Sequence, residues 1–227
     1  MSVKKRVKTL YQSFDRNKLF PIEEAVEIVK KSATAKFDET VEVHLRLGID
    51  PKKGEQQVRS TVVLPYSFGE SKKVAAFVTE DKAKEAKEAG ADIVYTEGDI
   101  EQLKKSGKID FDIAVAIPEI MKSLSPLARI LGPKGLMPSP KNETIATNLK
   151  KTIGELKKGK VAFKNDDSGN IHQAIGKVST DAKSLVENIS TFLEAVKKSK
   201  PETSKGVFIR ALTICSSMGQ GVKVETK

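Results

Sequence analysis

The sequence predicts an α/β protein of two domains: a split α+β domain formed by both chain ends, and an inserted Rossmann-like three-layer α/β domain. Three observations predict this. The chain has 227 residues, 38% of them hydrophobic, and cores tend to split as chains approach this length. The middle of the chain alternates strand and helix patterns. Each flank has too few elements for a core of its own, so we expect residues 1–67 and 159–227 to fold together around residues 68–158.

The N-terminal flank predicts a helix and then a strand. Residues 21–31 begin with Pro21, a good first helical residue, and continue with apolar residues at helical spacing. Residues 40–49 alternate apolar and polar side chains, so one row of the strand faces a core. The other row, with Thr40, Glu42, His44 and Arg46, stays open to solvent or a ligand.

The remaining elements follow from periodicity and from turn residues. In the middle unit, strand and helix patterns alternate, which predicts a parallel sheet of three or four strands with crossover helices. In the C-terminal flank, two strands are expected to pair around a turn at 166–169, and the cysteine-containing tail predicts a central strand with Cys215 in the core. The predicted elements are strands at 59–65, 73–78, 92–96 and 112–118, helices at 81–90 and 144–159, paired strands at 161–165 and 171–179, a helix at 180–201, and a strand at 206–216 that runs into a loop at 216–221.

The charge distribution favours a polyanionic partner. Forty basic and thirty acidic residues give a formal net charge of +10. Residues 1–67 (thirteen basic, nine acidic) and 159–227 (eleven basic, seven acidic) are each +4, whereas 68–120 sum to −4 and 121–158 to +6. Two basic flanks, on either side of an insert with an acidic part and a basic part, are expected of a protein that binds the phosphate backbone of a nucleic acid. Solvated lysine faces that only maintain solubility are the alternative.

Composition also indicates where the protein works. We expect no membrane partner, because no run approaches the roughly 18 apolar residues of a spanning helix. The basic segment 1–10 lacks a following apolar stretch, so we expect no signal peptide. One cysteine allows no disulfide within the chain, which favours the cytoplasm. Aromatic residues are only 5%, without tryptophan, so folded RNA is a better ligand than single strands bound by base stacking.

The sequence motifs predict no catalytic residues, no cofactor and no metal site. The loop at 66–73 lacks the glycine spacing of a nucleotide-binding loop, and Pro133 stands where a phosphate site would want an amide donor. His44 and His172, the two histidines, lie in predicted strands without Cys or His at metal-ligand spacing. Asp166 and its neighbour fit a turn better than an acid and base pair.

The loop at 131–141 predicts a binding element. Three prolines stiffen it, two glycines allow close backbone approach, and it is basic. A structural turn is the alternative, although turns rarely need this many residues. The candidate contact residues in the loop are Gly132, Lys134, Gly135, Met137 and Lys141.

At this loop the chain resembles the bacterial ribosomal protein L1 family, for which GPKGLMP is a hallmark. The resemblance also includes AKFDETVEVHLRLGIDPKKGEQQVRSTVVLP, EAGAD, FDIAVA, IHQAIGKVS and SSMGQGVKV, in the family's order and spacing. It implies a ribosome-associated, cytoplasmic protein that is a monomer when free, with hinges near 65–69 and 158–159. The implied partners are large-subunit ribosomal RNA at the mobile stalk, tRNA leaving the exit site, and the protein's own messenger RNA, whose translation it represses.

The resemblance also implies where RNA binds. Ser217 and Gly219 are expected to offer a hydroxyl and backbone amides to sugar and phosphate oxygens, and Met218 to pack on a base or ribose. An isolated Phe37 would by itself be taken for a core aromatic. Tyr66, Ser67 and Gln220 depart from the family pattern. The predicted RNA-binding residues are Lys36, Phe37, Thr40, Glu42, His44, Arg46, Lys164, His172, Ser217, Met218 and Gly219.

Two other function classes are weighed against RNA binding. A nucleotide-dependent enzyme on the insert would bind nucleotides saturably. A DNA-binding regulator would prefer particular duplex sequences. The sequence favours a non-enzymatic RNA-binding scaffold over both.

Overall fold

The computed structural model describes residues 15, 17–69, 72–107, 109–146 and 148–226, so the basic segment 1–10 lies outside the described residues. The chain divides into two compact units. One joins Met1–Gly69 to Ala162–Lys227, and the other spans Glu70–Val161. The breaks that the sequence predicts, after residues 67 and 158, lie two to three residues earlier.

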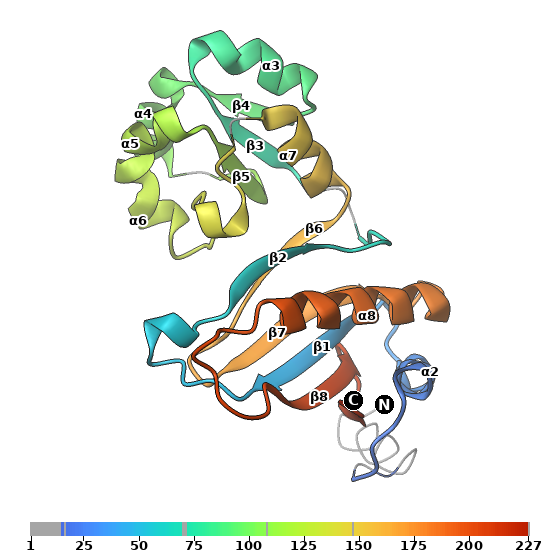
Figure 1. The fold of residues 1–227 in the computed structure, drawn as a ribbon. Coiled ribbons are helices and arrows are strands. Elements are labelled where there is room, and N and C mark those ends of the chain that lie inside the picture. The colour runs from blue at the N-terminus through green and yellow to red at the C-terminus, as the bar shows by residue number, and fades with distance from the viewer. Residues whose placement is uncertain (1–14, 16, 70–71, 108, 147, 227) are drawn as a thin grey trace. The chain divides into compact units, whose positions relative to one another are not determined.

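The first unit contains a four-stranded antiparallel sheet in the order β7-β1-β8-β9 (Figure 1). The strand β1 comes from the N-terminal part of the chain, and the other three strands come from the C-terminal part. The two ends of the chain therefore share one sheet. The strands are β1 (Thr40–Leu47), β7 (Asn170–Lys177), β8 (Ile209–Ser216) and β9 (Val222–Val224).

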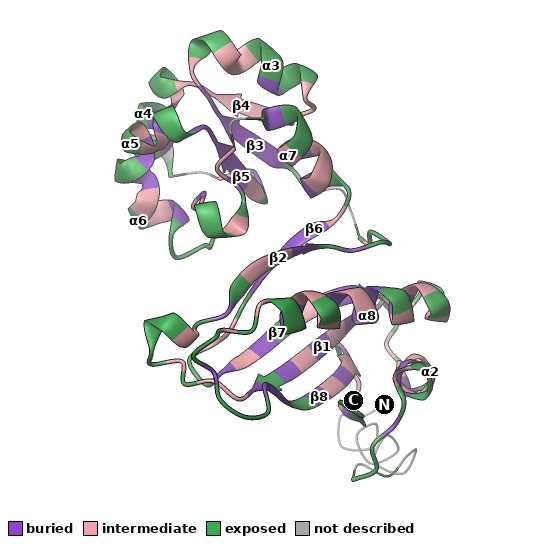
Figure 2. Cartoon of the chain, in the orientation of Figure 1, coloured by how far each residue is buried: buried purple, intermediate pink, exposed green. Residues whose placement is uncertain are grey.

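Two helices, α2 (Ile22–Ser32) and α8 (Ala182–Lys198), cover one face of this sheet. They contact each other, and between them they contact β7, β8 and β9. Alternate residues of β1 are buried, as the striped strands of Figure 2 show. The predicted helix and strand are both present, although Pro21 is the N-cap of α2 rather than its first residue. The core of this unit includes Val43, Leu45, Ile175, Ile189 and Phe192.

A separate two-stranded sheet pairs β2 (Arg59–Val63) with β6 (Lys160–Lys164). The predicted pairing of the strands around the 166–169 turn is therefore wrong. Only one bridge, between Asn165 and Ile171, joins them. Instead β6 pairs with β2, and its Phe163 packs edge-on against Phe192 of α8, with ring centroids 5.3 Å apart, while β7 pairs with β1.

The second unit has a parallel sheet of three strands in the order β4-β3-β5, as the alternating pattern predicts. The helix α3 contacts α7 and the helix α4 contacts α5, and these two groups lie on opposite sides of the sheet (Figure 1). All four residues of β3 are buried. The elements are β3 (Val74–Phe77), α3 (Ala83–Glu88), β4 (Ile93–Tyr95), α4 (Glu97–Ser106), β5 (Ile113–Ala116), α5 (Met121–Leu124), α6 (Ala128–Leu131) and α7 (Leu149–Lys157), with short 3-10 turns at Glu80–Lys82, Pro118–Ile120, Ser125–Leu127 and Pro140–Asn142.

Four helices of this unit differ from the sequence prediction: α4 and the one-turn helices α5 and α6 are additional, and α7 is shorter. The helix α4 was not predicted, although Thr96 and Asp99 form a capping box at its start and Gly107 ends it in the left-handed conformation. The helix α7 is shorter than the predicted 144–159. Ile145 forms a bridge with Ala116 of the sheet, so the helix begins only after Asn148, whose side chain accepts a hydrogen bond from the Lys151 amide.

Candidate nucleic-acid interface

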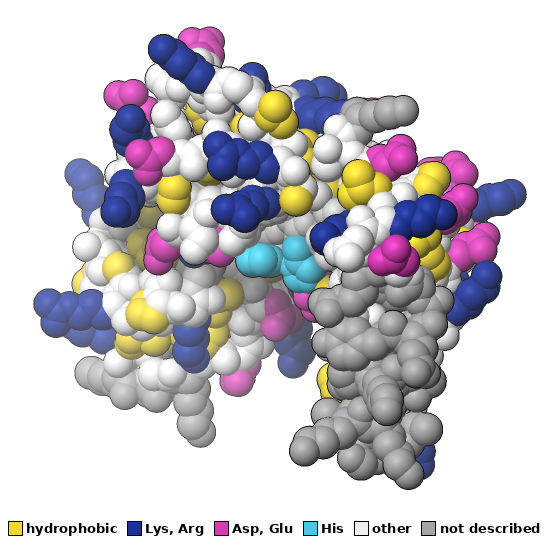
Figure 3. Space-filling view, turned by 90° about the horizontal axis from the view of Figure 1, so that it is seen from below, with side chains coloured by type: hydrophobic (Ala, Val, Ile, Leu, Met, Phe, Trp, Pro, Cys, Tyr) yellow, Lys and Arg dark blue, Asp and Glu magenta, His cyan; other side chains and the backbone are white. Residues whose placement is uncertain are grey.

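The face of the four-stranded sheet that α2 and α8 leave uncovered carries the polar row of β1. Thr40, Glu42 and His44 are half-buried and Arg46 is exposed, while the residues between them are buried. This is the open row that alternation predicts. Figure 3 looks toward this side of the first unit and shows the two histidines next to each other. We call this surface, formed by the outward side chains of β1, β7, β8 and β9, the open face.

Cys215 belongs to the open face and not to the core, so the sequence expectation for it is wrong. In β8 the residues Leu212, Ile214 and Ser216 are buried, whereas Thr213 and Cys215 between them are half-buried. Strand alternation thus places the thiol on the same side as Glu42, its neighbour across the strand pair. Burial and the charge of Glu42 raise the pKa of Cys215 to about 11.

The two histidines contact each other across β1 and β7. His44 and His172 are register partners, and their Nδ1 atoms lie 2.7 Å apart. The Nε2 atom of His44 lies 3.1 Å from Cys215 Sγ, and the Nε2 atom of His172 lies 3.6 Å from an Asp166 carboxylate oxygen. Burial and then the neighbouring His172 lower the pKa of His44, although Glu42 opposes this effect. The lowered pKa favours the neutral form of His44.

Glu39 joins the connector before β1 to the loop after β8. This buried side chain accepts a hydrogen bond from the Ala35 amide at 2.9 Å. Its other carboxylate oxygen accepts the Ser216 hydroxyl at 2.6 Å and the Met218 amide at 3.0 Å. One buried carboxylate thus fixes two segments that lie about 180 positions apart in the sequence.

Further hydrogen bonds fix the same junction. The Thr40 amide donates to the Ser217 hydroxyl at 3.1 Å, and the Ser217 amide donates to the Thr40 carbonyl at 3.0 Å. The Lys177 ammonium donates to the Thr40 hydroxyl at 2.9 Å. Beside them, the hydroxyl of Ser179 donates to Asp38 at 2.7 Å and lowers the pKa of that carboxyl. The segment 36–40 and the loop 216–219 therefore form one continuous rim, which we call the Glu39 rim.

Large apolar side chains project from the Glu39 rim. Phe37 is 57% exposed and Met218 is 47% exposed, and Lys36 is exposed beside Phe37. The core interpretation of Phe37 is therefore wrong. Full burial of a Phe or Met side chain contributes roughly 1.5–3 kcal/mol, of which a part remains unrealised for these two residues in the free protein.

The backbone amides of the loop are not available to a ligand, in contrast to the sequence expectation. The amides of Ser217, Met218 and Gly219 donate to Thr40, Glu39 and Ser216 respectively. Gly219 has a different role, because a Cβ atom at this position would lie 2.3 Å from the Ser216 hydroxyl oxygen that binds Glu39. The loop therefore needs glycine here for close packing.

The structure does not group all the predicted contact residues together. Lys164 is exposed on β6, in the separate two-stranded sheet. The loop at 131–141 lies in the second unit. Its residues Gly132, Lys134, Gly135 and Lys141 are exposed and Met137 is half-buried. The other predicted contact residues lie together in the first unit, on the open face and the Glu39 rim.

Sequence reasoning missed three residues of this group. Glu39 has the appearance of an ordinary polar residue before a strand, and no local signal shows that it is buried. Lys177 is half-buried beside Thr40, its register partner. Lys223 is exposed opposite Thr213 on β9. The last two could have been found only by knowing which strands are neighbours.

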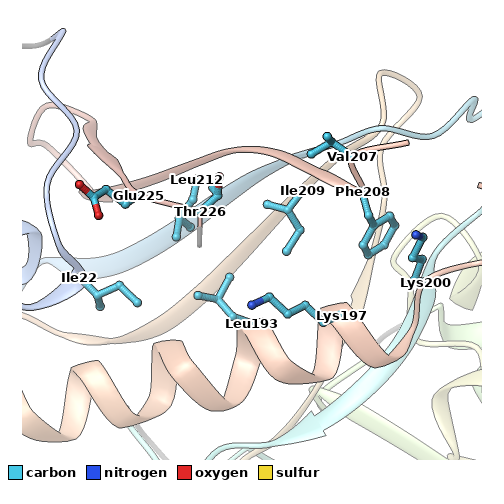
Figure 4. A pocket seen from close by; sticks show the side chains of 10 residues that line it. All are labelled: Ile22, Leu193, Lys197, Lys200, Val207, Phe208, Ile209, Leu212, Glu225 and Thr226. Atoms are coloured by element: carbon cyan, nitrogen blue, oxygen red, sulfur yellow. The ribbon is translucent and has the colours of Figure 1, made fainter. Parts of the chain in front are cut away.

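Two hollows lie elsewhere in the first unit. The first, of about 260 Å³, lies between α8 and β8, and Figure 4 shows Leu193 of α8 facing Ile209 across it. The second, of about 450 Å³, is lined by Lys53, Lys205 and Arg210 among others. Among the described residues, the ionisable groups that line the first hollow are Lys197, Lys200 and Glu225.

No helix in the described part of the chain has both the length and the apolar character that crossing a bilayer requires.

Comparison with known proteins identifies the family. Residues 29–220 match the model of the ribosomal protein L1p/L10e family. The large ribosomal subunit protein uL1 of Solibacter usitatus (strain Ellin6076) is 47% identical over 210 residues, which cover 92% of this chain and 89% of that relative. With a family match over most of its length and a relative of this similarity, the chain belongs to the ribosomal protein L1p/L10e family, as a structural and non-enzymatic ribosomal protein.

Proposed function

We propose that the Glu39 rim and the open face bind a folded segment of large-subunit ribosomal RNA. The family makes the protein a ribosome-associated, cytoplasmic component of the large subunit. The single observation that carries the proposal is the Glu39 junction. It fixes Phe37 and Met218 as exposed apolar side chains at the edge of a polar sheet face.

Each part of this surface has a chemical role in the proposal. Phe37 stacks on an unpaired base, and Met218 packs against a base or ribose. Thr40, Glu42, His44, Arg46 and His172 contact sugar hydroxyls, base edges and phosphates from the sheet. Ser217 contributes its hydroxyl oxygen, since its amide is already bonded to Thr40. Lys36 supplies positive charge near the phosphates, and Lys164 extends the surface onto β6.

The second unit has its own part in the proposal. Its loop with Gly132, Lys134, Gly135, Met137 and Lys141 adds a secondary RNA contact. The unit moves about hinges near 65–69 and 158–159 and helps to release deacylated tRNA from the exit site. Gly69 and Gly159 support this location of the hinges, because each has a positive φ, of 78° and 95°, at a connection between the units.

In this proposal the same surface also regulates translation of the protein's own messenger RNA. An element of the protein's own messenger RNA that resembles the ribosomal site binds the open face and the Glu39 rim, and translation is repressed. Because one surface serves both RNAs, ribosomal RNA competes with the messenger. A labelled messenger leader would be displaced by a ribosomal RNA fragment, and binding of both at once would contradict this part of the proposal.

The main experiment measures binding of the full chain to a structured large-subunit RNA fragment and to duplex DNA at moderate salt. We expect the RNA to bind much more tightly. Phe37→Ala should weaken RNA binding by about 1–3 kcal/mol, the range for loss of one base stack, and Met218→Ala should weaken it less. Val207→Ala is the matched control, because Val207 is 71% exposed and lies away from the rim, next to the first hollow. Equal effects of the three variants, or a preference for duplex DNA, would contradict the proposal.

The salt dependence gives a second readout. Lys36→Ala should reduce the slope of log affinity against log salt by about 1, because one phosphate contact and its released counterion are lost. Lys183→Ala is the control. Lys183 is exposed on α8, which covers the other face of the sheet, so its loss should leave the slope unchanged.

A further inference from the structure

The chain's one cysteine and both of its histidines meet on the open face. The sequence contains one Cys and two His, and they come from three strands: His44 from β1, His172 from β7 and Cys215 from β8. Glu42 stands directly across from Cys215 in the register of β1 and β8. Strand pairing thus gathers every thiol and imidazole of the chain at one place, together with a carboxylate.

The donor atoms have the spacing of metal ligands. A carboxylate oxygen of Glu42, a ring nitrogen of His44 and the thiol sulfur of Cys215 all lie within 4.8 Å of one another. The Nε2 atom of His44 is 3.1 Å from Cys215 Sγ and 3.8 Å from Glu42 Oε2. Around a tetrahedral zinc ion, with bonds of about 2.0–2.3 Å, such atoms stand roughly 3.3–3.8 Å apart. Small side-chain rotations are therefore enough to accommodate an ion.

The surrounding hydrogen bonds prepare the His44 nitrogen for this role. The amides of Ser168 and Asn170 donate to the Asp166 carboxylate at 2.9 and 2.7 Å, and the other oxygen of that carboxylate lies 3.6 Å from His172 Nε2. With the His172 proton on Nε2, toward Asp166, the Nδ1 atom of His172 accepts the proton that His44 carries on Nδ1. The lone pair of His44 Nε2 then points toward the cysteine.

This is the outer arrangement that metal-binding histidines usually have, in which the second ring nitrogen donates to a fixed partner. The side chains of His44 and Glu42 are 30% and 38% exposed, so an ion can reach the group from solvent. A thiolate, an imidazole and a carboxylate together prefer borderline ions such as Zn²⁺ or Co²⁺, whereas Mg²⁺ and Ca²⁺ prefer oxygen ligands.

We propose that Glu42, His44 and Cys215 form a binding site for a divalent transition-metal ion of the zinc class. The fourth coordination position is open to solvent, and His172 is a positioning residue that orients His44. On binding, the S–H bond of Cys215 breaks, a sulfur–metal bond forms and the proton passes to solvent, with no change in oxidation state. The proposal differs from the sequence expectation of no metal site, which relied on spacing along the chain and not across strands.

The test is a Co²⁺ titration of the tag-free full chain, followed by its visible absorption. We expect one equivalent to produce tetrahedral ligand-field bands and a thiolate-to-cobalt charge-transfer band, which Zn²⁺ removes and Mg²⁺ does not. Cys215→Ser should abolish the charge-transfer band. Glu42→Gln and His44→Gln should each weaken the binding that this band reports. Glu187→Gln, at an exposed position on α8, is the control and should bind as the wild type does.

The role of His172 has its own variants. His172→Val removes the acceptor for the His44 N–H and should weaken Co²⁺ binding by about 10–100-fold, whereas His172→Gln keeps an acceptor and should retain most of the affinity. Circular dichroism checks that each variant is folded. The absence of a charge-transfer band in the wild type would overturn the proposal. Wild-type affinity in both Glu42→Gln and His44→Gln would overturn it as well, since a lone thiol would then be the ligand.

Discussion

The carboxylate of Glu39 accepts the hydroxyl hydrogen of Ser216 at 2.6 Å, and both side chains are buried. Glu39 stands directly before β1, and Ser216 is the last residue of β8. The bond thus joins the start of β1 to the end of β8, beside the residues proposed to contact RNA.

Glu39→Ala should lower the free energy of unfolding by about 3 kcal/mol. The substitution leaves the Ala35 amide, the Met218 amide and the Ser216 hydroxyl without their charged acceptor, and buried donors without partners are costly. Urea denaturation measures the change. Glu27→Ala is the control, because its ion pair with Lys31 is exposed and should contribute less than about 1 kcal/mol. Similar effects of both variants would show that the Glu39 junction is not a stabilising feature.

Gly219→Ala should displace the loop and weaken RNA binding, with a loss of stability of about 1–3 kcal/mol. The added methyl group would lie 2.3 Å from the Ser216 hydroxyl oxygen. Gly54→Ala provides the comparison, since nothing lies within 4 Å of a Cβ atom there. Thermal unfolding and RNA titration of the two variants distinguish them. A Gly219→Ala protein with wild-type stability and affinity would contradict the packing role of this glycine.

Asn188→Ala should destabilise the first unit by about 2–4 kcal/mol, because this fully buried amide serves three backbone groups. Its oxygen accepts the Tyr66 amide at 3.0 Å, and its nitrogen donates to the carbonyls of Tyr66 and Ile175 at 2.9 and 3.0 Å. Asn188→Asp should be worse, since a carboxylate cannot donate to the two carbonyls. Glu187→Ala, one residue earlier and exposed, serves as the reference in hydrogen exchange and denaturant melts. If all three variants unfold at the same urea concentration, the hydrogen bonds between Asn188 and the Tyr66 backbone do not contribute to stability.

The contribution of Glu155 to stability should disappear in acid. Its pKa is lowered, first of all by the hydrogen bond from the buried Lys160 ammonium at 2.8 Å. When folding lowers the pKa of a carboxyl, that group stabilises the protein fully at pH values above its ordinary pKa of 4.5. This stabilisation is lost as the pH falls through the pKa that the group has in the folded protein. The stability difference between the wild type and Glu155→Gln should therefore be constant near neutral pH and shrink below about pH 4.5.

Hydrogen exchange of the α7 amides at a series of pH values measures this difference. Glu119→Gln is the control, because the Glu119 carboxylate is 64% exposed and 3.9 Å from Lys82. A difference for Glu155→Gln that stays the same from neutral pH down to pH 3 would refute the prediction.

Local sequence patterns predict most of the longer helices and strands of this protein. The alternation of Val41, Val43, Leu45 and Leu47 fixed both the strand and its open row, because one face of a sheet must be apolar when helices cover it. The parallel sheet of the second unit followed from the alternation of strands and helices. The helix α4 was missed because Ile100 and Leu103, its buried apolar residues, are too few for a helical stripe to be visible.

Strand partners and buried polar residues could not be predicted in this way. The sequence around the 166–169 turn suits a hairpin, but β6 pairs with β2, a strand about one hundred positions earlier in the chain. Cys215 was assigned to the core because apolar residues precede it on both faces of β8. Glu39 carries no local sign of burial, since its three donors come from the connector and from the other end of the chain. Such relationships exist only once the sheet has formed.

The position of β1 between β7 and β8 has a consequence for how the protein folds during its synthesis on the ribosome. Both of its neighbours are encoded after the second unit, so β1 emerges from the exit tunnel long before either can pair with it. The second unit is continuous in sequence and can fold while the C-terminal residues are still being translated. The sheet of the first unit must wait for β8 and β9, and a nascent chain that stalls before β8 presents one edge of β1 unpaired to chaperones.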